Sequence, residues 1–452
     1  MKPAPENIRK IYFLGIGGIG MSALARYFRA KGISIHGYDK TPTSLTAELE
    51  SEGMIIHFKD DINLIPGDSD LVIYTPAIPK TLKEFIFLKE SGIPMYKRAE
   101  VTGMVTEGKT TVAIAGTHGK TSISSLIAHL LLTAGFPATA LIGGISKNYS
   151  TNFITSGKEE IMVVEADEYD RSFLSLFPDI AVISAIDPDH LDIYGTAEEV
   201  NHSFNDFTGN IKPDGRLVAR NGLSLLLSTG KKRINYAYDE STDVFGTNLR
   251  NEEGYQKFDL ISPWGKINDI CLQIPGIHNV ENALAAASVC LSLGVSNERI
   301  AEGIESFSGV RRRFDTRLKQ QNCVYIDDYA HHPRELEAFI SAVRQIYPGK
   351  KLTGLFQPHL YSRTRDFADG FAKSLDLLDE AWLLDIYPAR ELPIPGVTSR
   401  MILDQMQSEH KKLVSKEQVL QLLKEEKHQV FLTIGAGDID MLVEPITKIL
   451  QA

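Results

Sequence analysis

Short apolar runs alternate with amphipathic stretches along most of the chain. In residues 9–96 the apolar runs KIYFLGI, SIHGYD and SDLVIYTPAI are separated by segments with helical spacing. One of these segments predicts a helix from about Met21 to Lys31. Apolar runs that alternate with helical patterns are typical of parallel strands joined by crossover helices. The pattern therefore predicts an α/β fold with mostly parallel sheets.

The alternation starts again at two later points. TTVAIAGTHGKTSISSLIAHLLLTAG has the pattern of a strand, a loop and a helix, and the strand-like runs EIMVVEAD and DIAVISAID follow it. Residues 215–275 are less regular and predict edge strands or a small antiparallel patch. After the alanine-rich helix in NVENALAAASVCLSLGV, strands and helices alternate once more. With joints near Gly108 and Val310, and roughly 150 residues per domain, we expect three domains: 1–108, 109–310 and 311–452.

Composition and charge narrow the functional classes. The chain is 43% hydrophobic and 23% charged, as in ordinary globular proteins, and its net charge of −10 offers no broad basic surface for nucleic acid or an anionic membrane. The start, MKPAPENIRK, lacks the apolar core of a signal peptide, and three cysteines show no metal-ligand spacing. The most apolar stretch is interrupted by His129, Gly135 and Pro137, which favours a helix, a turn and a strand over a membrane span. We expect a cytoplasmic monomer or homodimer that neither binds nucleic acid nor inserts into a membrane.

The segment FLGIGGIGMS has the Gly-x-Gly-x-x-Gly spacing of a pyrophosphate-binding turn. It carries Gly15, Gly17, Gly18 and Gly20 between a predicted strand and a predicted helix, so backbone N–H groups and the helix N-terminus can approach a pyrophosphate. Asp39 ends the next strand about 20 residues later, where an acid can accept a hydrogen bond from a ribose. A UDP-sugar and a dinucleotide present the same charged centre, and the glycines can also serve helix packing alone. The motif therefore leaves the ligand open.

A second phosphate loop is indicated by AIAGTHGKTS. It departs from the usual G-x-x-x-x-G-K-[ST] spacing, because Ile114 stands where the first glycine belongs and Gly116 comes later. Lys120 can still reach the β and γ phosphates, and the Thr121 hydroxyl can bind Mg²⁺. The backbone that would surround the phosphates comprises Gly116, Thr117, His118, Gly119, Lys120 and Thr121. The loop predicts a nucleoside triphosphate site with Mg²⁺.

Acidic residues follow two strands of this second unit. VVEADEYD carries Glu165, Asp167, Glu168 and Asp170, and DPDHLDIYG supplies Asp187, Asp189, His190 and Asp192. Oxygen ligands of this kind suit Mg²⁺. Any one of these acids can cap a helix or stand in a solvated loop, and a lone histidine is usually a packing residue. Their clustering at two strand ends favours a metal and phosphate site.

The ordered motifs resemble those of the Mur ligase superfamily over nearly the whole chain. The resemblance rests on FLGIGGIGMS, AGTHGKTS, VVEADEYD, DPDHLDIYG, PGIHNVENALAA, GVRRRF, IDDYAHHP, FQPHLYSRTRDF, YPARELPIPGVTS and GAGD. It implies an N-terminal Rossmann-like domain that holds a UDP-sugar and a central P-loop ATPase-like domain with a mostly parallel sheet. It also implies a C-terminal Rossmann-like domain that contacts ATP and an amino acid. The first glycine loop is then expected to hold the UDP-linked substrate and the second ATP, neither of them redox-active.

The resemblance also implies roles for individual residues. Lys120 is expected to contact the γ-phosphate, and Thr121, Glu165 and His190 to bind magnesium. Asn279 and Asn282 are expected to contact adenine, Arg313 the phosphates and Asp327 the ribose. The expected amino-acid pocket consists of Tyr329, His331 and Arg363. Two plainer interpretations remain: His331, close to Pro333, can cap the following helix, and Arg363 can be a surface arginine. Leu360 stands where many relatives place another arginine, for which Arg363 or Arg365 can compensate.

The reaction that the resemblance implies is the ATP-dependent joining of L-alanine to the lactyl carboxylate of UDP-N-acetylmuramate, in the synthesis of peptidoglycan precursors. The carboxylate is activated as an acyl phosphate, with Lys120, Mg²⁺ and Arg313 offsetting the charge of the two anions. His331, with its native pKa, is a candidate base for the amine. Closure about a hinge near Val310 is expected to exclude water from the acyl phosphate.

Three alternatives stay open at this point. A related branch of the superfamily attaches a recycled tripeptide in place of alanine, and it carries a similar EADEYD segment. An NAD-dependent oxidoreductase explains the first glycine loop but leaves the second loop and the acids without a purpose. An ATP-driven switch module explains the second loop but not the YAHHP and YSRTR segments.

Overall fold

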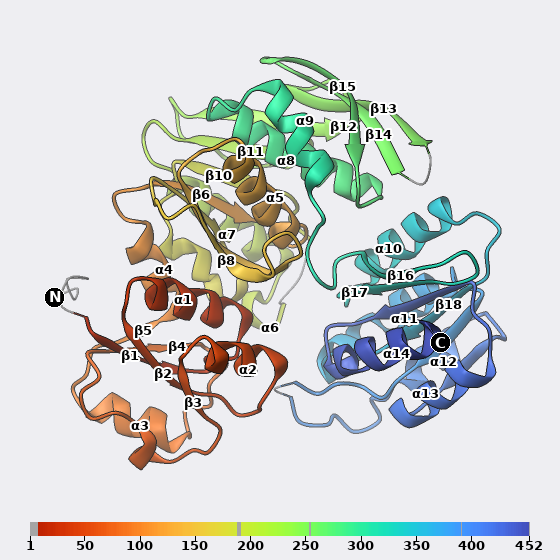
Figure 1. The fold of residues 1–452 in the computed structure, drawn as a ribbon, viewed down its shortest axis with the longest axis horizontal. Helices are drawn as coiled ribbons and strands as arrows, with labels where there is room; N and C mark the ends of the chain where they lie inside the picture. Colours follow the sequence, from red (N-terminus) through yellow and green to blue (C-terminus); the bar gives the residue numbers. More distant parts are fainter. Residues whose placement is uncertain (1–7, 188–190, 253–254, 390, 452) are drawn as a thin grey trace. The chain divides into compact units, whose positions relative to one another are not determined.

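The computed structural model describes residues 8–187, 191–252, 255–389 and 391–451. Within these ranges the strands form three sheets, of five, ten and six strands, each built from one consecutive part of the chain (Figure 1). Most neighbouring strands run parallel and are connected by helices. The predicted α/β class with mostly parallel sheets is confirmed.

The first sheet has the order β3-β2-β1-β4-β5 and is parallel throughout. Its carboxyl ends, which follow Leu14, Tyr38 and Lys97, therefore lie at one edge. The predicted helix at 21–31 is confirmed as α1, Ile19–Ala30. The elements are β1 (Lys10–Leu14), α1, β2 (Ser34–Tyr38), α2 (Ser44–Ser51), β3 (Ile55–His57), η2 (Ile62–Leu64), β4 (Leu71–Tyr74), α3 (Lys83–Glu90), β5 (Met95–Lys97) and α4 (Arg98–Thr106).

The second sheet has the order β15-β14-β13-β12-β11-β10-β6-β9-β7-β8. Strand β6 (Thr110–Ala115) pairs in parallel with both β9 (Ile161–Glu165) and β10 (Ile180–Ile183), so the loops after these three strands meet at one edge. The remaining elements are α5 (Lys120–Thr133), β7 (Ala138–Ser146), β8 (Thr151–Thr155), η3 (Tyr169–Ser175), α6 (Leu191–Tyr194), α7 (Ala197–Gly209), β11 (Arg216–Arg220), β12 (Lys232–Tyr238), β13 (Val244–Glu252), β14 (Tyr255–Ser262), β15 (Gly265–Leu272), α8 (Ile277–Ser292) and α9 (Asn297–Ser306).

The strands in residues 215–275 correct one expectation. Strands β11, β12 and β13 continue the second sheet in parallel from β10, so the predicted antiparallel patch is wrong for them. They do lie toward one side of the sheet, as expected from the other prediction for this region, that of edge strands. Their apolar pattern is weak because much of β12 and β13 is only half-buried.

The third sheet has the order β16-β17-β21-β18-β19-β20. Only β16 pairs antiparallel among the described pairings of this sheet. Its elements are β16 (Asp315–Lys319), β17 (Val324–Asp328), α10 (Pro333–Ile346), β18 (Leu352–Phe356), α11 (Tyr361–Leu375), β19 (Glu380–Leu383), α12 (Arg400–Gln405), β20 (Lys411–Leu413), α13 (Lys416–Glu425), β21 (Val430–Ile434), η4 (Asp438–Leu442) and α14 (Val443–Gln451).

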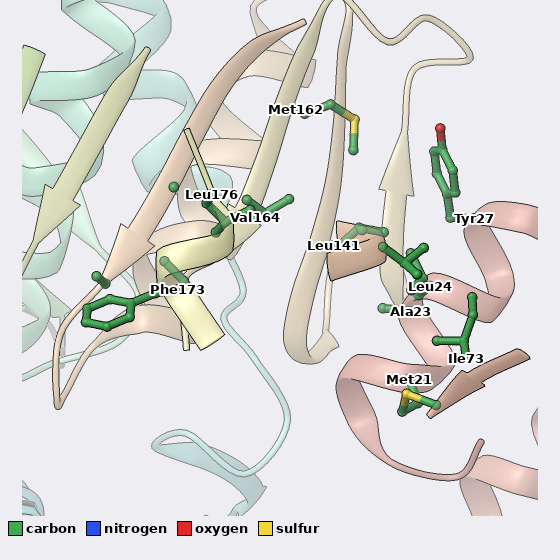
Figure 2. Close-up of a cluster of buried hydrophobic side chains, with 14 of the residues drawn as sticks. Met21, Ala23, Leu24, Tyr27, Ile73, Leu141, Met162, Val164, Phe173 and Leu176 are labelled. Carbon is green, nitrogen blue, oxygen red and sulfur yellow. The ribbon is translucent and has the colours of Figure 1, made fainter. Parts of the chain in front are cut away.

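The chain divides into two compact units. The first comprises 1–249, 258–271 and 281–308, and the second comprises 250–257, 272–280 and 309–452. Within the first unit one hydrophobic core joins the first two sheets: Leu24 and Tyr27 of α1 lie in the same cluster as Leu141 of β7 (Figure 2). Helix α1 therefore fixes the first glycine loop against the second sheet. No helix among the described residues combines the length and hydrophobicity needed to cross a membrane.

Candidate functional site

The first glycine loop connects β1 to α1 and is held by Asp39. Gly15 has a φ of +85°, a conformation that favours glycine. The backbone N–H of Gly17 donates to Asp39 Oδ2 at 2.8 Å. A Cβ on Gly17 would lie 2.9 Å from the same oxygen, which leaves no room for a side chain. The predicted residues thus come together, and Asp39 has a task that the sequence did not indicate: it fixes the loop backbone.

Gly20 lies against a residue that sequence reasoning missed. A Cβ on Gly20 would lie 2.9 Å from Nη1 of Arg98, the first residue of α4. The other terminal nitrogen, Nη2, lies 3.2 Å from Asp167 Oδ2. Arg98 follows β5 directly, so the parallel sheet brings it to the edge that carries the glycine loop. Only the tertiary fold reveals this neighbour, because 78 positions separate it from Gly20.

The second loop places Lys120 at the start of α5. Gly116 and Gly119 have φ of +135° and +84°, which turns the chain sharply between β6 and the helix. Lys120 Nζ donates to Gly116 O at 2.6 Å and to the two carboxylate oxygens of Glu168 at 2.9 and 2.8 Å. Burial lowers the pKa of Lys120, but the carboxylates of Glu168 and Asp167 raise it further, so the net shift is upward. Lys120 is therefore charged at neutral pH and held at the mouth of the loop.

The predicted magnesium ligands meet in part. Thr121 Oγ1 donates to Glu165 Oε2 at 3.2 Å, and the other oxygen of Glu165 accepts from Ser124 Oγ at 3.1 Å and from the Gly143 backbone at 2.5 Å. Two hard oxygen ligands thus converge beside Lys120. This suits Mg²⁺, which is usually bound by one or two protein oxygens together with phosphates and water. His190 lies outside the described residues, among which no group of three or more His, Cys, Asp or Glu side chains is arranged around a metal position.

The rest of the second loop is fixed by the end of β10. Thr117 Oγ1 accepts from the Asp187 backbone at 3.1 Å, and His118 Nε2 lies 3.1 Å from Asp187 Oδ2. Ser184, which the sequence did not single out, donates its hydroxyl to the carbonyl of His118. These contacts hold the loop against the residues that end and follow β10. Asp189, like His190, lies outside the described residues.

The two expected adenine contacts fall in different compact units. Asn282 belongs to the first unit, where its Oδ1 would lie 2.7 Å from a Cβ on Gly119, so its amide borders the phosphate loop. Asn279 belongs to the second unit, where its Nδ2 donates to Pro275 O at 2.8 Å. Both asparagines lie on α8, three positions apart, and Asn282 is the one placed against the phosphate loop.

The acidic loop after β9 forms ion pairs with the start of α4. Besides the pair of Asp167 with Arg98, Asp170 Oδ2 lies 2.9 Å from Lys97 Nζ. Asp170 and Arg171 both adopt φ near +54°, at 53° and 54°, which is unusual for residues with a side chain. The loop that supplies Glu165 is thus tied to the first sheet by two cations, a link that no sequence motif indicated.

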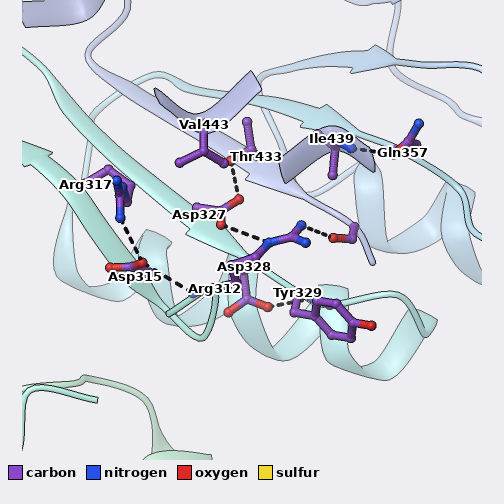
Figure 3. A network of polar contacts seen from close by, with 12 residues as sticks. Arg312, Asp315, Arg317, Asp327, Asp328, Tyr329, Gln357, Thr433, Ile439 and Val443 are labelled. Carbon is purple, nitrogen blue, oxygen red and sulfur yellow. Dashed lines mark hydrogen bonds and ion pairs between the residues drawn. The ribbon is translucent and has the colours of Figure 1, made fainter. Parts of the chain in front are cut away.

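In the second unit Asp327 forms the centre of a buried network (Figure 3). Its Oδ2 lies 3.2 Å from Arg312 Nε, its Oδ1 accepts from Thr433 Oγ1 at 2.6 Å, and Arg312 Nη2 donates to Gly435 O at 2.5 Å. Burial raises the pKa of Asp327, although Arg312 opposes the rise. Each oxygen keeps a second lone pair, but the side chain is only 1% exposed, so a ribose contact would require the structure around Asp327 to open. Arg312 therefore has a structural role, which the motif GVRRRF alone did not distinguish from the phosphate contact predicted for Arg313.

The RRRF turn directs two arginines to Tyr329. Arg312 and Phe314 have φ of +62° and +47°, and Asp328 holds the turn by accepting from the Phe314 backbone at 2.6 Å. Burial raises the pKa of Asp328 to about 6. The guanidinium of Arg313 lies 5.1 Å from the Tyr329 ring centroid, and that of Arg312 lies 5.2 Å from it. The predicted phosphate arginine and one predicted amino-acid contact are therefore neighbours.

His331 is half-buried, and its pKa is lowered. Burial lowers the pKa of His331 to about 4, and Nδ1 lies 3.0 Å from Tyr329 O. The expectation of a native pKa is wrong, because partial burial disfavours the charged ring, although 20% of the side chain stays exposed. The capping interpretation is also wrong: His332 is the N-cap of α10, with Glu335 completing a capping box.

Arg363 lies in the first turn of α11 and is only 8% exposed, so it is not a surface arginine. It is close enough to His331 to contribute to the depressed pKa of that histidine. Arg365, in contrast, is exposed and pairs with Asp366 at 2.7 Å. Leu360 is buried at the N-cap of α11 with a φ of +68°. Of the two arginines expected to compensate for Leu360, only Arg363 lies beside the predicted amino-acid residues.

Comparisons with known proteins decide the family. The Mur ligase family catalytic domain matches residues 10–110, the Mur ligase middle domain matches 114–290, and the Mur ligase glutamate ligase domain matches 312–437. The chain belongs to the Mur ligase family. It is 48% identical over 452 residues to the UDP-N-acetylmuramate–L-alanine ligase of Parabacteroides distasonis, with 98% of each chain covered.

Solved structures agree with this Mur ligase assignment. The UDP-N-acetylmuramate-alanine ligase of Thermotoga maritima superposes with a TM-score of 0.85 at 27% identity, covering 98% of this chain and 99% of that one. A murein peptide ligase from Psychrobacter arcticus gives a TM-score of 0.73 at 19% identity, with 98% of each chain covered, and shows the shared fold. The predicted three-domain Mur ligase architecture is confirmed.

Proposed function

We propose that the protein is an ATP-dependent ligase that joins L-alanine to the lactyl carboxylate of UDP-N-acetylmuramate and releases ADP and phosphate. One observation carries the proposal: two phosphate loops of different type lie in one compact unit, and the acidic loop after β9 contacts residues at both. A ligase needs this arrangement, because ATP must activate a carboxylate that arrives on a second phosphorylated substrate. The names of relatives at 45–48% identity support alanine as the amine.

The first step joins two anions, the γ-phosphoryl group and the lactyl carboxylate. Lys120, charged and already at the loop, exchanges Glu168 and Gly116 O for phosphate oxygens. Bound through Thr121, Glu165 and His190, Mg²⁺ would supply further positive charge at the phosphates. Arg313 is the cation that the second unit contributes. Removing one such contact typically costs about 10²–10³ in rate.

In the second step the alanine amine attacks the acyl phosphate and phosphate leaves. Arg363 binds the alanine carboxylate, and Tyr329 borders the same pocket. His331 is unprotonated at neutral pH because its pKa is about 4, so it can accept a hydrogen bond from the ammonium. A group with so low a pKa is a poor general base. We therefore assign His331 to positioning the amine, and the proton passes to solvent or phosphate.

The proposal includes the finer points that the sequence suggested. The glycine loop with Asp39 holds the UDP moiety, and Gly116–Thr121, Asn279 and Asn282 hold ATP. The domains are 1–108, 109–310 and 311–452, and the protein acts in the cytoplasm as a monomer or homodimer. The tripeptide-adding alternative has weaker support, because the two murein peptide ligase matches are only 19% and 22% identical.

The test is phosphate release from ATP in the presence of UDP-N-acetylmuramate and either L-alanine, the tripeptide L-Ala-γ-D-Glu-meso-diaminopimelate, or no amine. We expect release to require alanine and to yield a product with the mass of the alanyl amide. Lys120→Ala should lower the rate by about 10²–10³. Release that depends only on the tripeptide would support the recycling branch, and release without any amine would contradict a ligase.

A further inference from the structure

A small cavity lies between α4 and the segment that follows β9. Arg98 and Thr102 of α4 line one side, and Glu165 and Asp167 line the other. Among its lining residues in the described part of the chain, Arg98 alone carries a positive charge. The cavity thus joins a predicted magnesium ligand to an arginine for which the sequence offered no role.

Arg98 also reaches the first glycine loop. Nη1 lies 2.9 Å from where a Cβ on Gly20 would stand, and Nη2 lies 3.2 Å from Asp167 Oδ2. The side chain is 22% exposed, so a ligand can approach it. The guanidinium therefore occupies the space between the loop proposed for the diphosphate and the strand end that carries Glu165.

A cation at this place suits the chemistry of the UDP-sugar. Its diphosphate binds the glycine loop, whereas its lactyl carboxylate must reach the γ-phosphate beside Lys120 and Glu165. A carboxylate that approaches Arg98 meets the negative charges of Glu165 and Asp167, which line the same small cavity. Lys120 is committed to the phosphates of ATP. An arginine matches a carboxylate with a fork of parallel N–H donors, a geometry that a lysine does not provide.

We infer that Arg98 binds the lactyl carboxylate of the UDP-sugar, exchanging its resting partner Asp167 for the substrate. The inference rests on the proposed function and adds a substrate-binding residue to it. Arg98 then aims the carboxylate oxygen at the γ-phosphate, while the diphosphate stays on the glycine loop. Asp167 competes with the substrate for the same guanidinium.

The test separates the carboxylate from the rest of the substrate. UDP-N-acetylglucosamine carries the same diphosphate and a closely similar sugar but lacks the lactyl group, so it serves as a competitive inhibitor that Arg98 should not recognise. For Arg98→Ala we expect the KM for UDP-N-acetylmuramate to rise about 10- to 100-fold, as for a lost hydrogen bond to a charged group. The inhibition constant of UDP-N-acetylglucosamine should stay within about twofold of wild type, the scatter expected where no contact is lost.

Two further variants guard against a merely structural effect. Asp167→Asn frees Arg98 from its competitor and should lower the KM for UDP-N-acetylmuramate. Arg98→Lys keeps the charge but loses the fork, so its KM should lie between those of wild type and Arg98→Ala. Lys97→Ala is the matched control: it removes the neighbouring cation, whose partner Asp170 does not line the cavity, and should leave both constants unchanged.

The outcomes distinguish this inference from the proposed function. Wild-type turnover with alanine, combined with an unchanged KM in Arg98→Ala and Arg98→Lys, would overturn the role of Arg98 alone. A parallel loss of UDP-N-acetylmuramate and UDP-N-acetylglucosamine binding would also overturn it, because Arg98 would then read the diphosphate or hold the fold. A wild-type protein without alanine-dependent release would contradict the proposed function itself.

Discussion

Three histidines with lowered pKa values make the stability of this protein sensitive to acid. Burial lowers the pKa of His129, His278 and His331 to about 4 in each case. His129 is the simplest of the three to interpret, because burial is the one cause of its pKa shift. It lies on α5, with Nδ1 3.0 Å from Tyr149 Oη and Nε2 2.9 Å from Ser306 Oγ. Protonation would place a charge among groups packed inside the first unit. His278 and His331 lie in the second unit together with Asp328, whose pKa is raised to about 6. Asp328 therefore gains stability for the folded state as the pH falls, which opposes the effect of the two histidines.

We predict that His129 costs the protein stability as the pH falls. Its folded pKa of about 4 lies below the unfolded value of about 6.5. The unfolded chain therefore takes up a proton that the folded chain does not, and stability is lost between these two pH values. The loss should reach about 1–2 kcal/mol at pH 5. His129→Gln should show a smaller fall in melting temperature than wild type between pH 7.5 and pH 5; equal falls would contradict the assignment.

Local motifs predicted those site residues whose neighbours are close in sequence or at strand ends. Thr121 and Glu165 were expected together, since a phosphate loop and an acidic strand end share one sheet edge, and they lie 3.2 Å apart. Arg98 and Ser184 were missed, because their contacts with Gly20 and His118 depend on how distant segments pack. The pKa of His331 was mispredicted for the same reason: burial is a property of the folded unit.

At the scale of elements, the start of α1 is fixed by a strand of the second sheet. Asn152 of β8 is fully buried, and its Nδ2 donates to Ile19 O at 2.7 Å and to Ser22 Oγ at 2.8 Å. Its Oδ1 accepts from Arg26 Nη1 at 2.6 Å. One amide thus satisfies three groups of α1, directly after the glycine loop.

We predict that Asn152→Ala destabilises the first unit by about 2–4 kcal/mol, because it takes this partner from the buried side chains of Arg26 and Ser22. A fall in melting temperature, together with faster proteolytic cleavage near residues 15–20, would be the signature. Asn201→Ala is the control, since Asn201 is exposed on α7 and its Nδ2 donates to Ala197 O of the same helix at 3.2 Å. It should change stability by no more than about 0.5 kcal/mol. Similar effects of the two substitutions would contradict the role of Asn152.

Elements with strong periodicity were predictable, whereas half-buried ones were not. Helix α1 and the parallel strands around both loops followed from alternating apolar and helical patterns. Strands β12 and β13 did not, because their many half-buried and exposed positions remove the continuous apolar run that indicates a parallel strand. The docking of β8 on α1 had no sequence signal, since a single buried asparagine resembles a loop residue.

At the scale of the whole molecule, the proposed site residues are divided between two compact units. Lys120, Thr121 and Glu165 belong to the first, and Arg313 and Arg363 belong to the second. The order of motifs along the chain predicted three domains of the Mur ligase type, because each domain carries its own set. How far ligands move the units could not follow from the sequence, since it depends on the balance of contacts between folded bodies.

We predict that the substrates draw the two units together. An acyl phosphate hydrolyses in open solvent, so the ligase reaction requires the amino-acid residues of the second unit to cover the phosphates bound by the first. The segment near Val310, where the chain passes from the first unit to the second, would absorb the backbone change. Small-angle X-ray scattering should show a smaller radius of gyration with a non-hydrolysable ATP analogue and UDP-N-acetylmuramate than without ligands. Lys120→Ala, which weakens nucleotide binding, should require more analogue for the same change, and an unchanged radius in the saturated wild type would contradict closure.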